Sequence, residues 1–309
     1  LADAPLEFDQ ASLHGGLVDP ERTASGQRAA VSRDGQQMLE IVPVETHRAM
    51  RHCGPILQSC ALRREAPMPK LQRMNTSIDD RIHTSQAFKA SMRAQWDTAA
   101  AGWNAHAADI RSWLHKPTDA MCRMAGVRTG SRVLDVAAGS GDQTLTLAQQ
   151  VGAQGHVLAT DLSPAIVALA QENATRAGFS HVETRVADGE DLGVVEASFD
   201  AAVCRLGLMF FPDPLRGLRE IHRALRPGGG VCTMVFSRPE KNPCLTILMS
   251  TALKHAGLPA RDPFVAGGLL SLGQPGRIDT LFRSAGFHDV ATTALDAVFR
   301  LPSVDHYLA

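Results

Sequence analysis

The feature that most constrains the fold is an alternation of short apolar segments with amphipathic ones in the middle of the chain. Five segments are apolar and bounded by turn residues, as buried strands are. They lie at residues 132–138, 156–161, 182–188, 200–207 and 230–237. Segments of helical periodicity separate them. Because right-handed crossovers place such helices on both faces of one sheet, the pattern predicts an α/β fold with a doubly wound, mostly parallel sheet.

The helix expected after the second strand has the clearest ends. Ser163 can cap its N-terminus, Pro164 suits its first position, and Gly178 can adopt the left-handed conformation that often stops a helix. The helix expected between the last two strands carries an apolar face and ends at the sequence Arg-Pro-Gly-Gly-Gly, residues 226–230. These signals support the alternating pattern.

Segments outside the five strands are expected to cover the sheet. Trp96 and Trp103 recur at helical spacing within residues 88–110, which predicts an N-terminal helical cap of one or two helices. Residues 240–275 form an insertion after the fifth strand, with enough apolar side chains to line a lipophilic pocket or to pack as a helical lid.

The first part of the chain has a different character. Residues 1–73 mix Arg, Gln, Gly, Pro and Ser without a sustained period of 2 or 3.6, so they are expected to be a disordered or non-native N-terminal extension. Met74 begins a more regular segment. The folded domain is therefore expected to span residues 74–309.

Composition excludes several classes of protein. The formal net charge is -1, so the whole chain has no electrostatic attraction for nucleic acid or an anionic membrane. No apolar run approaches the roughly 20 residues of a transmembrane helix. The six cysteines form no CxxC pair and indicate reduced thiols in a cytoplasmic protein. No metal site is predicted, because zinc spacing is absent among His47, His52, Cys53 and Cys60.

Candidate ligand-binding residues follow three of the predicted strands. In a doubly wound sheet the ligand lies beyond the carboxyl ends of the strands. A turn with Gly139 and Gly141 follows the first strand, where missing side chains let a ligand approach the backbone. Asp161 ends the second strand and is placed to accept hydrogen bonds from two ribose hydroxyls. Asp188 ends the third strand and can accept from an adenine amino group.

The turn separates two classes of nucleoside ligand. Dinucleotide-binding turns have a third glycine, where this chain has Thr144. Asp135 and Asp142 flank the turn and would repel a pyrophosphate, whereas they would favour a sulfonium or ammonium group. The charge pattern therefore favours S-adenosylmethionine over a nicotinamide dinucleotide.

Five sequence motifs resemble, in order, those of class I S-adenosylmethionine-dependent methyltransferases. They read VLDVAAGSGDQT, ATDLSP, ADGEDL, FDAAVCRLGLMFFPDP and LRPGGGVCTMVF. The turn is similar to that of the ubiquinone/menaquinone biosynthesis methyltransferases and related small-molecule enzymes. The chain departs from that type at Ala137, where the first glycine is common, and at Cys204-Arg205-Leu206-Gly207 after the fourth strand.

The resemblance covers residues 95–300 and implies a Rossmann-like methyltransferase fold with bound S-adenosylmethionine. The cofactor-binding residues that it implies are Asp135, Ala137, Gly139, Ser140, Gly141, Asp161, Leu162, Asp188, Gly189 and Arg205. Arg205 has a surface ion pair as an equally weighted alternative. Enzymes of this class usually end in a seventh, antiparallel strand. Here residues 276–286 and 288–300 are expected to form a helix and a sixth strand, so the domain is expected to be truncated at its C-terminus.

The expected activity is methyl transfer to a small-molecule acceptor, lipophilic or aromatic, at oxygen or carbon. No catalytic residue is predicted; His222 and His255 are candidates by chemistry alone, and a boundary position is favoured for His222. A nicotinamide-dependent oxidoreductase is the alternative on a similar fold, but the chain lacks a Tyr-x-x-x-Lys sequence. A nucleic-acid methyltransferase should show basic clusters with aromatic residues. A protein methyltransferase and a non-catalytic binding protein remain open, and no oligomeric state is predicted.

Overall fold

The computed structural model describes residues 36–45 and 70–300. Within them one sheet has the strand order β4-β3-β2-β5-β6-β1-β7. Its strands are β1 (Gln36–Glu45), β2 (Arg132–Val136), β3 (His156–Asp161), β4 (Val182–Val186), β5 (Phe199–Arg205), β6 (Leu225–Phe236) and β7 (Thr293–Val298). The α-helices are α1 (Lys70–Ala105), α2 (Ala107–Met124), α3 (Asp142–Val151), α4 (Pro164–Arg176), α5 (Pro214–Ala224), α6 (Pro243–His255) and α7 (Arg277–Ser284).

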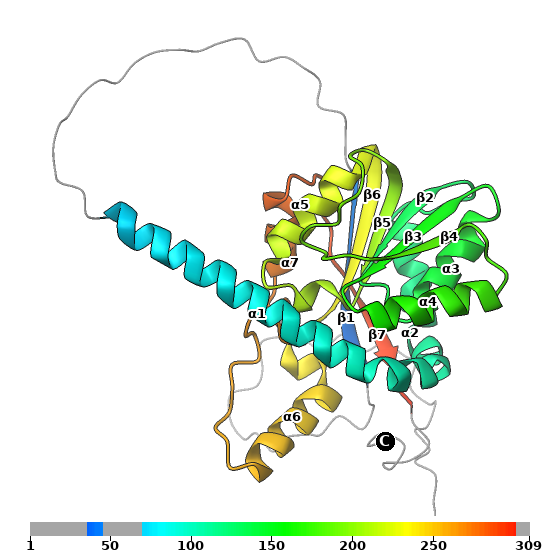
Figure 1. Cartoon of the computed structure of the whole chain (residues 1–309). Coiled ribbons are helices and arrows are strands. Elements are labelled where there is room, and N and C mark those ends of the chain that lie inside the picture. The colour runs from blue at the N-terminus through cyan, green and yellow to red at the C-terminus, as the bar shows by residue number, and fades with distance from the viewer. Residues whose placement is uncertain (1–35, 46–69, 301–309) are drawn as a thin grey trace, which may run out of the picture.

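The doubly wound sheet predicted from the sequence is confirmed. Strands β4, β3, β2, β5 and β6 pair in parallel, and helices pack on both faces of the sheet (Figure 1). Buried apolar residues fill the strands; those of β2 and β5 include Val133, Leu134, Ala201, Ala202 and Val203, each fully enclosed. Such continuous apolar strands are expected where helices cover both faces of a sheet.

Helix α4 begins and ends where the sequence indicates. The Ser163 side chain accepts a hydrogen bond from the backbone N–H of Ile166 at 3.1 Å, and Pro164 occupies the first turn. The helix ends at Arg176, and Gly178 follows with a φ of 79°. The cap matters for the site because it fixes the segment between Asp161 at the end of β3 and the first turn of α4.

A strand from the N-terminal part of the chain lies inside the sheet, which corrects part of the sequence prediction. β1 pairs antiparallel with β6, from Leu39↔Phe236 to Glu45↔Gly230, and with β7, from Gln36↔Val298 to Ile41↔Thr293. The predicted extension thus contains a strand at Gln36–Glu45, and α1 already begins at Lys70. The rest of residues 1–69 lies outside the described residues.

The antiparallel strand of this sheet comes from the N-terminal side of the domain. The sequence predicts a sheet left incomplete because its seventh strand is missing from the C-terminal end. The structure instead has β1 between β6 and β7. The sixth predicted strand is present as β7, and residues 301–309 lie outside the described part of the chain.

Two elements extend beyond the edge at which the parallel strands end. The long helix α1 crosses this edge and is followed at His106 by α2, so the predicted N-terminal cap consists of two helices (Figure 1). Helix α6 belongs to the insertion after β6 and projects away from the sheet (Figure 1). Among the described residues no helix combines the length and the apolar character that a membrane span needs.

Candidate functional site

A cavity of about 500 Å³ lies at the carboxyl ends of the parallel strands, between them and the two N-terminal helices. The loops after β2, β3, β4 and β5 line one side, and α1, α2 and the insertion line the other. Seven of the predicted cofactor residues line it: Ala137, Gly139, Asp161, Leu162, Asp188, Gly189 and Arg205. Asp135, Ser140 and Gly141 do not belong to its lining.

The turn after β2 brings backbone to the cavity surface. Gly139 has a φ of 58°, and a Cβ at this position would lie 3.4 Å from Nε1 of Trp103 on α1. Gly141 has a φ of 90°, and a Cβ there would lie 3.3 Å from the backbone of Ala170 on α4. Gly139 therefore keeps space open beneath α1, whereas Gly141 allows the turn to pack against α4.

The two departures from the quinone-methyltransferase pattern touch one another. Ala137 has a φ of 54°, a conformation that favours glycine, and Leu206 has a φ of 57°. A Cβ at Gly207 would lie only 2.4 Å from the Cβ of Ala137. Glycine at position 207 therefore makes room for the methyl group at position 137. Both strained residues, Ala137 and Leu206, line the cavity. Backbone strain of this kind is often found at functional sites.

Asp161 ends β3 and faces the glycine turn. Its Oδ2 accepts a hydrogen bond from the backbone N–H of Gly139 at 3.1 Å, and its Oδ1 accepts from that of Ser163 at 3.1 Å. Burial raises the pKa of this carboxyl above its ordinary value. Each carboxylate oxygen can accept further hydrogen bonds, so the side chain is fixed in place and still able to receive two hydroxyl groups of a ligand.

Asp135 lies behind the turn rather than in the cavity. Its carboxylate is fully buried and accepts hydrogen bonds from Gln143 Nε2 at 2.6 Å and from Thr144 Oγ1 at 2.7 Å. Burial raises the pKa of Asp135 to about 6. Thr144, which breaks the dinucleotide pattern, thus helps to hold the first turn of α3 against the end of β2.

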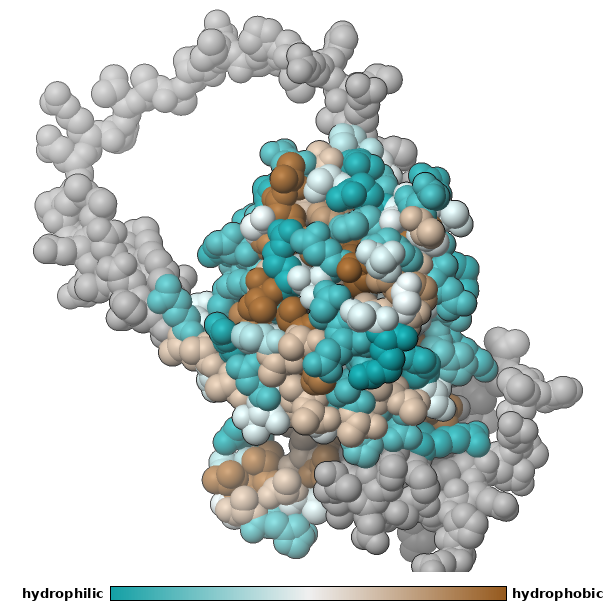
Figure 2. All heavy atoms as spheres, turned by 45° about the vertical axis from the view of Figure 1, so that its right-hand side comes forward, coloured by the Kyte–Doolittle hydropathy of each residue, from teal (hydrophilic) through white to brown (hydrophobic). Residues whose placement is uncertain are grey.

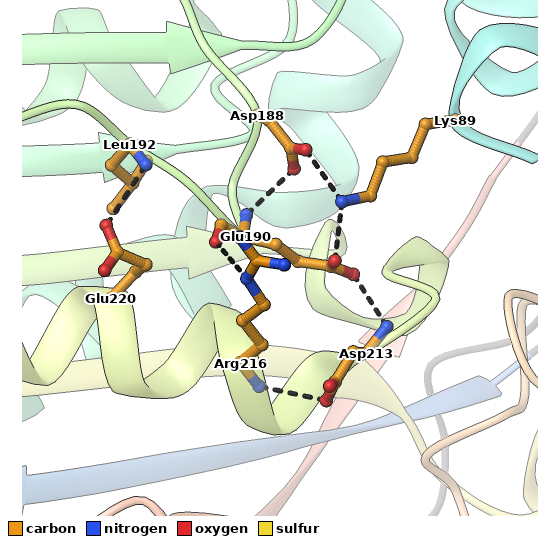
Figure 3. Close-up of polar contacts among 7 residues, drawn as sticks. All are labelled: Lys89, Asp188, Glu190, Leu192, Asp213, Arg216 and Glu220. Atoms are coloured by element: carbon orange, nitrogen blue, oxygen red, sulfur yellow. Dashed lines mark hydrogen bonds and ion pairs between the residues drawn. The ribbon is translucent and has the colours of Figure 1, made fainter. Parts of the chain in front are cut away.

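Asp188 belongs to a cluster of charged residues at one end of the cavity (Figure 3). Its Oδ2 lies 2.7 Å from the ammonium of Lys89 on α1, and its Oδ1 accepts from the backbone N–H of Glu190 at 2.9 Å. Lys89 also lies 2.5 Å from Glu190 Oε2. The neighbouring Gly189 packs closely on Phe211, because a Cβ there would lie 2.1 Å from the Phe211 ring.

Arg205 is the last residue of β5 and is buried rather than exposed. It donates hydrogen bonds to Thr118 Oγ1 on α2 at 2.8 Å and to Asp142 Oδ2 at 2.9 Å. Arg111 contacts the other oxygen of Asp142 at 2.7 Å. The alternative prediction for Arg205, an ion pair on the surface, is therefore wrong, because the ion pair that it forms is buried. The pair joins the end of β5 to the first turn of α3, while the hydrogen bond to Thr118 adds α2 to this contact. Arg205 also lines the cavity.

Aromatic and ionisable residues of the N-terminal helices complete the site, and of these the sequence pattern indicated Trp96 and Trp103 only as parts of a cap. Trp96 packs edge-on against Trp103 and against Phe210, with ring centroids 5.5 and 5.9 Å apart. His106 Nδ1 lies 3.1 Å from Asp109 Oδ2, and both residues line the cavity. His106 stands between α1 and α2, and Asp109 lies in the first turn of α2, so their place at the cavity is visible only after these helices are packed on the sheet.

The two histidines considered as catalytic candidates lie elsewhere. His222 packs against Phe287, with ring centroids 4.9 Å apart, and burial lowers its pKa. His255 ends α6 and is exposed. Neither lines the cavity. The packing of His222 agrees with its predicted place at the boundary between core and surface.

The insertion after β6 contributes to the cavity through part of its apolar residues. Leu245 and Leu269 line the cavity. Ile247, Leu248 and Met249 are exposed on α6, with 42–54% of their surface accessible. Figure 2 shows apolar surface on the protrusion at the bottom of the view, where α6 lies. The expected lipophilic lining is therefore present in two leucines, while the outer residues of α6 remain on the surface.

In the part of the chain that the structure describes, potential metal ligands do not cluster and most of the thiols are buried. No group of three or more His, Cys, Asp or Glu residues is arranged there to hold a metal ion. Cys122, Cys204 and Cys232 are buried, and Cys244 is half-buried. Burial raises the pKa of both Cys122 and Cys204 to about 12, so these thiols are protonated at neutral pH.

Comparison with known proteins finds similarity to methyltransferases. Residues 109–255 match the ubiE/COQ5 methyltransferase family. The chain is 35% identical over 116 residues to the ubiquinone/menaquinone biosynthesis C-methyltransferase UbiE of Idiomarina loihiensis, covering 37% of this chain and 46% of that protein. It is 32% identical over 117 residues to the demethylmenaquinone methyltransferase of Listeria monocytogenes serotype 4a, covering 38% and 49%. The chain thus spans about half the length of these curated relatives.

One solved structure is similar to part of this chain. The S-adenosylmethionine-dependent methyltransferase of Aquifex aeolicus is 25% identical, covers 36% of this chain and 58% of its own, and gives a TM-score of 0.34.

The parallel sheet and the glycine turn are those expected of the S-adenosylmethionine-dependent methyltransferase class, to which the match over residues 109–255 also points. Within that class, the chain is a distant relative of the UbiE-type enzymes of the ubiE/COQ5 family. The residues present fit the cofactor of this class. Gly139 leaves an open cradle beside the turn, and Asp161 is fixed against it. Among the described residues, four carboxylates and two Lys or Arg side chains line the cavity. This excess of negative charge suits a ligand that carries a sulfonium and an amino group.

Proposed function

We propose that the protein transfers the methyl group of S-adenosylmethionine to a small lipophilic or aromatic acceptor at oxygen or carbon. The observation that carries the proposal is the continuity of one cavity. It extends from Asp161 and Asp188 to a wall of apolar and aromatic side chains. That wall includes Trp113, Phe236, Leu245, Leu269 and Phe299. A cofactor held at the carboxylates would thus share a dry space with an apolar acceptor.

In this proposal different residues bind different parts of the cofactor. Gly139 and Asp161 would bind the ribose end, with Leu162 beside them and Asp188 and Gly189 at the adenine end. Ala137 and Arg205 line the cavity next to the turn. Asp135, Ser140 and Gly141 would shape the turn from outside the cavity, since Asp135 bonds to α3 and Gly141 packs on α4.

The bound cofactor supplies a methyl group on a positively charged sulfur, which is an excellent leaving group. The protein has to align the acceptor with it and exclude water, and orientation alone is worth roughly 7–11 kcal/mol. Trp96, Trp103 and Phe210 form an edge-to-face aromatic group over the cavity that would exclude water. An acceptor that must lose a proton needs a base. His106, oriented by its contact with Asp109, is the group that we propose for this role.

The proposal is tested by incubating the purified protein with isotopically labelled S-adenosylmethionine and a panel of quinols, phenols and amines. Turnover of quinols or phenols above the amines is expected, and a His106→Gln variant should lose about 10²-fold or more on those acceptors. His222→Gln is the matched control, because this histidine lies outside the cavity. Cofactor binding without transfer to any member of the panel would favour a binding protein, and transfer to amines alone would overturn the acceptor class.

A further inference from the structure

The charged cluster at one end of the cavity joins elements that are far apart in the sequence. Lys89 on α1 contacts Asp188 and Glu190, which follow β4 (Figure 3). The Lys89 and Glu190 side chains are only 18% and 3% exposed. An ion pair so poorly accessible to solvent is screened less by salt than a surface pair. The contact is therefore a persistent link between α1 and the sheet.

The link satisfies charges that would otherwise be costly to bury. Burial lowers the pKa of Lys89, but hydrogen bonds and charge from Asp188 and Glu190 outweigh this and raise it above its ordinary value. The ammonium is therefore charged at neutral pH. Without it, two carboxylates would lie close together, one of them almost fully buried, with no cation to compensate their charge.

Glu190 extends the link to a third element. Its Oε1 accepts a hydrogen bond from the backbone N–H of Asp213 at 2.6 Å. Its own carbonyl oxygen accepts from Arg216 Nε at 2.9 Å, and Asp213 caps the start of α5 through the backbone N–H of Arg216 (Figure 3). Lys89 thus connects α1 with the loop after β4 and the segment that leads into α5.

Two further polar links hold α1 over the same end of the sheet. Asp97 accepts a hydrogen bond from the Ser163 hydroxyl at 2.5 Å, and Asn104 accepts from Asn173 at 2.8 Å. Lys89, Asp97 and Asn104 are eight and seven residues apart, a spacing that places them on one face of the helix. Lys89 provides the one ion pair among these three links.

We propose that Lys89 is a positioning residue that holds Asp188 in the orientation from which it accepts a hydrogen bond from the amino group of the cofactor's adenine. The inference rests on the proposed function. Asp188 is fixed on both sides, by Lys89 at Oδ2 and by the backbone N–H of Glu190 at Oδ1. Each oxygen keeps capacity for one more donor, so the carboxylate acts as a fixed acceptor beside the cavity.

The test compares S-adenosylhomocysteine with S-inosylhomocysteine, in which a carbonyl oxygen replaces the adenine amino group. Calorimetric Kd values are measured for the parent protein and for Lys89→Met. The parent is expected to prefer the adenosyl compound by about tenfold or more, because the inosyl compound leaves Asp188 facing an acceptor. K89M is expected to lose most of this preference. Arg93→Met, which removes an exposed cation one turn along α1, should keep it.

Each result bears on the inference. If K89M weakened both ligands by the same factor, Lys89 would serve only to hold the fold together. An unchanged preference in K89M, or a parent that binds both ligands equally, would also overturn the inference. If K89M does not fold, Lys89→Gln replaces it, since its amide still donates to one carboxylate without the charge, and its preference should fall at least about threefold. A parent that binds neither nucleoside would instead count against the proposed function.

Discussion

Ala137 and Gly207 show how two unusual residues can explain one another. Alanine occupies a left-handed position in the turn, and its methyl group fits because residue 207 has no side chain. Neither residue is explained by cofactor contact alone. At the scale of single residues, a departure from a family pattern is best interpreted together with the residue that it touches.

Gly207→Ala is therefore expected to destabilise the protein through a clash with Ala137. Overpacking of this kind usually costs about 1–3 kcal/mol. Ala137→Gly in the same chain should recover most of that loss, because the two substitutions are coupled through one contact. Chemical denaturation of the parent, both single variants and the double variant measures the coupling. Strictly additive effects would show that the contact does not govern the tolerance of either position.

Asp135 makes the stability of the fold depend on pH. Its pKa is raised from the ordinary 3.8 to about 6 by burial, so the folded state holds the proton more tightly than the unfolded state does. The contribution of Asp135 to the free energy of unfolding is therefore fully present below pH 3.8, and it is lost as the pH rises through about 6. Asp135→Asn removes this dependence. The free energy of unfolding of D135N relative to the parent should rise by about 2–3 kcal/mol between pH 4 and pH 7. A pH-independent difference would contradict the assignment.

At the scale of elements, local sequence signals predict what is decided locally. The cap at Ser163 and the stop at Gly178 define α4. Asp161 and Asp188 could be predicted from their places at the ends of the two apolar segments that form β3 and β4, and both line the cavity. The contribution of α1 was predictable only as a general cap. Lys89 reaches residues about a hundred positions away, and nothing in its own neighbourhood indicates that contact. Such a residue is found only once the helix is packed on the sheet.

The contact between Asp97 and the start of α4 is expected to hold the C-terminal half of α1 in place. Its carboxylate accepts hydrogen bonds from the Ser163 hydroxyl and from the backbone N–H of Ala165. Asp97→Ala should therefore increase amide hydrogen exchange in residues 90–105 while leaving α2 unchanged. Exchange is measured by mass spectrometry on the full chain. Equal protection of α1 in the variant and the parent would show that apolar packing alone holds the helix.

At the scale of the whole molecule, the sheet is completed by a strand that the sequence pattern did not reveal. The segment QQMLEIVPVE contains Pro43 and no strict alternation of apolar and polar residues, so it resembles the sequence around it. Its pairing with β6 and β7 depends on residues nearly two hundred positions away or more. Pro43 lies beyond the residues that pair with β7, where the strand has one neighbour and a missing donor is tolerated.

Interrupting β1 should loosen the β7 side of the sheet. Leu39 pairs with both β6 and β7, whereas Glu45 pairs with β6 alone at the end of the strand. Leu39→Pro removes a backbone donor from the middle of the ladder and should lower the free energy of unfolding by roughly 1 kcal/mol or more. Glu45→Pro is the matched control and should change stability less. If the two variants unfolded alike, β1 would not be an integral strand.

The cavity is expected to bind S-adenosylmethionine through the carboxylate of Asp161. Isothermal titration of the parent, of Asp161→Ala and of Glu172→Ala, an exposed carboxylate on α4, tests it most directly. The parent and E172A are expected to bind the cofactor with the same Kd and to show no binding of NAD. D161A is expected to bind it at least about tenfold more weakly, because charge-assisted hydrogen bonds to the ribose are lost. A D161A protein that binds the cofactor as tightly as the parent would show that Asp161 does not hold the ribose.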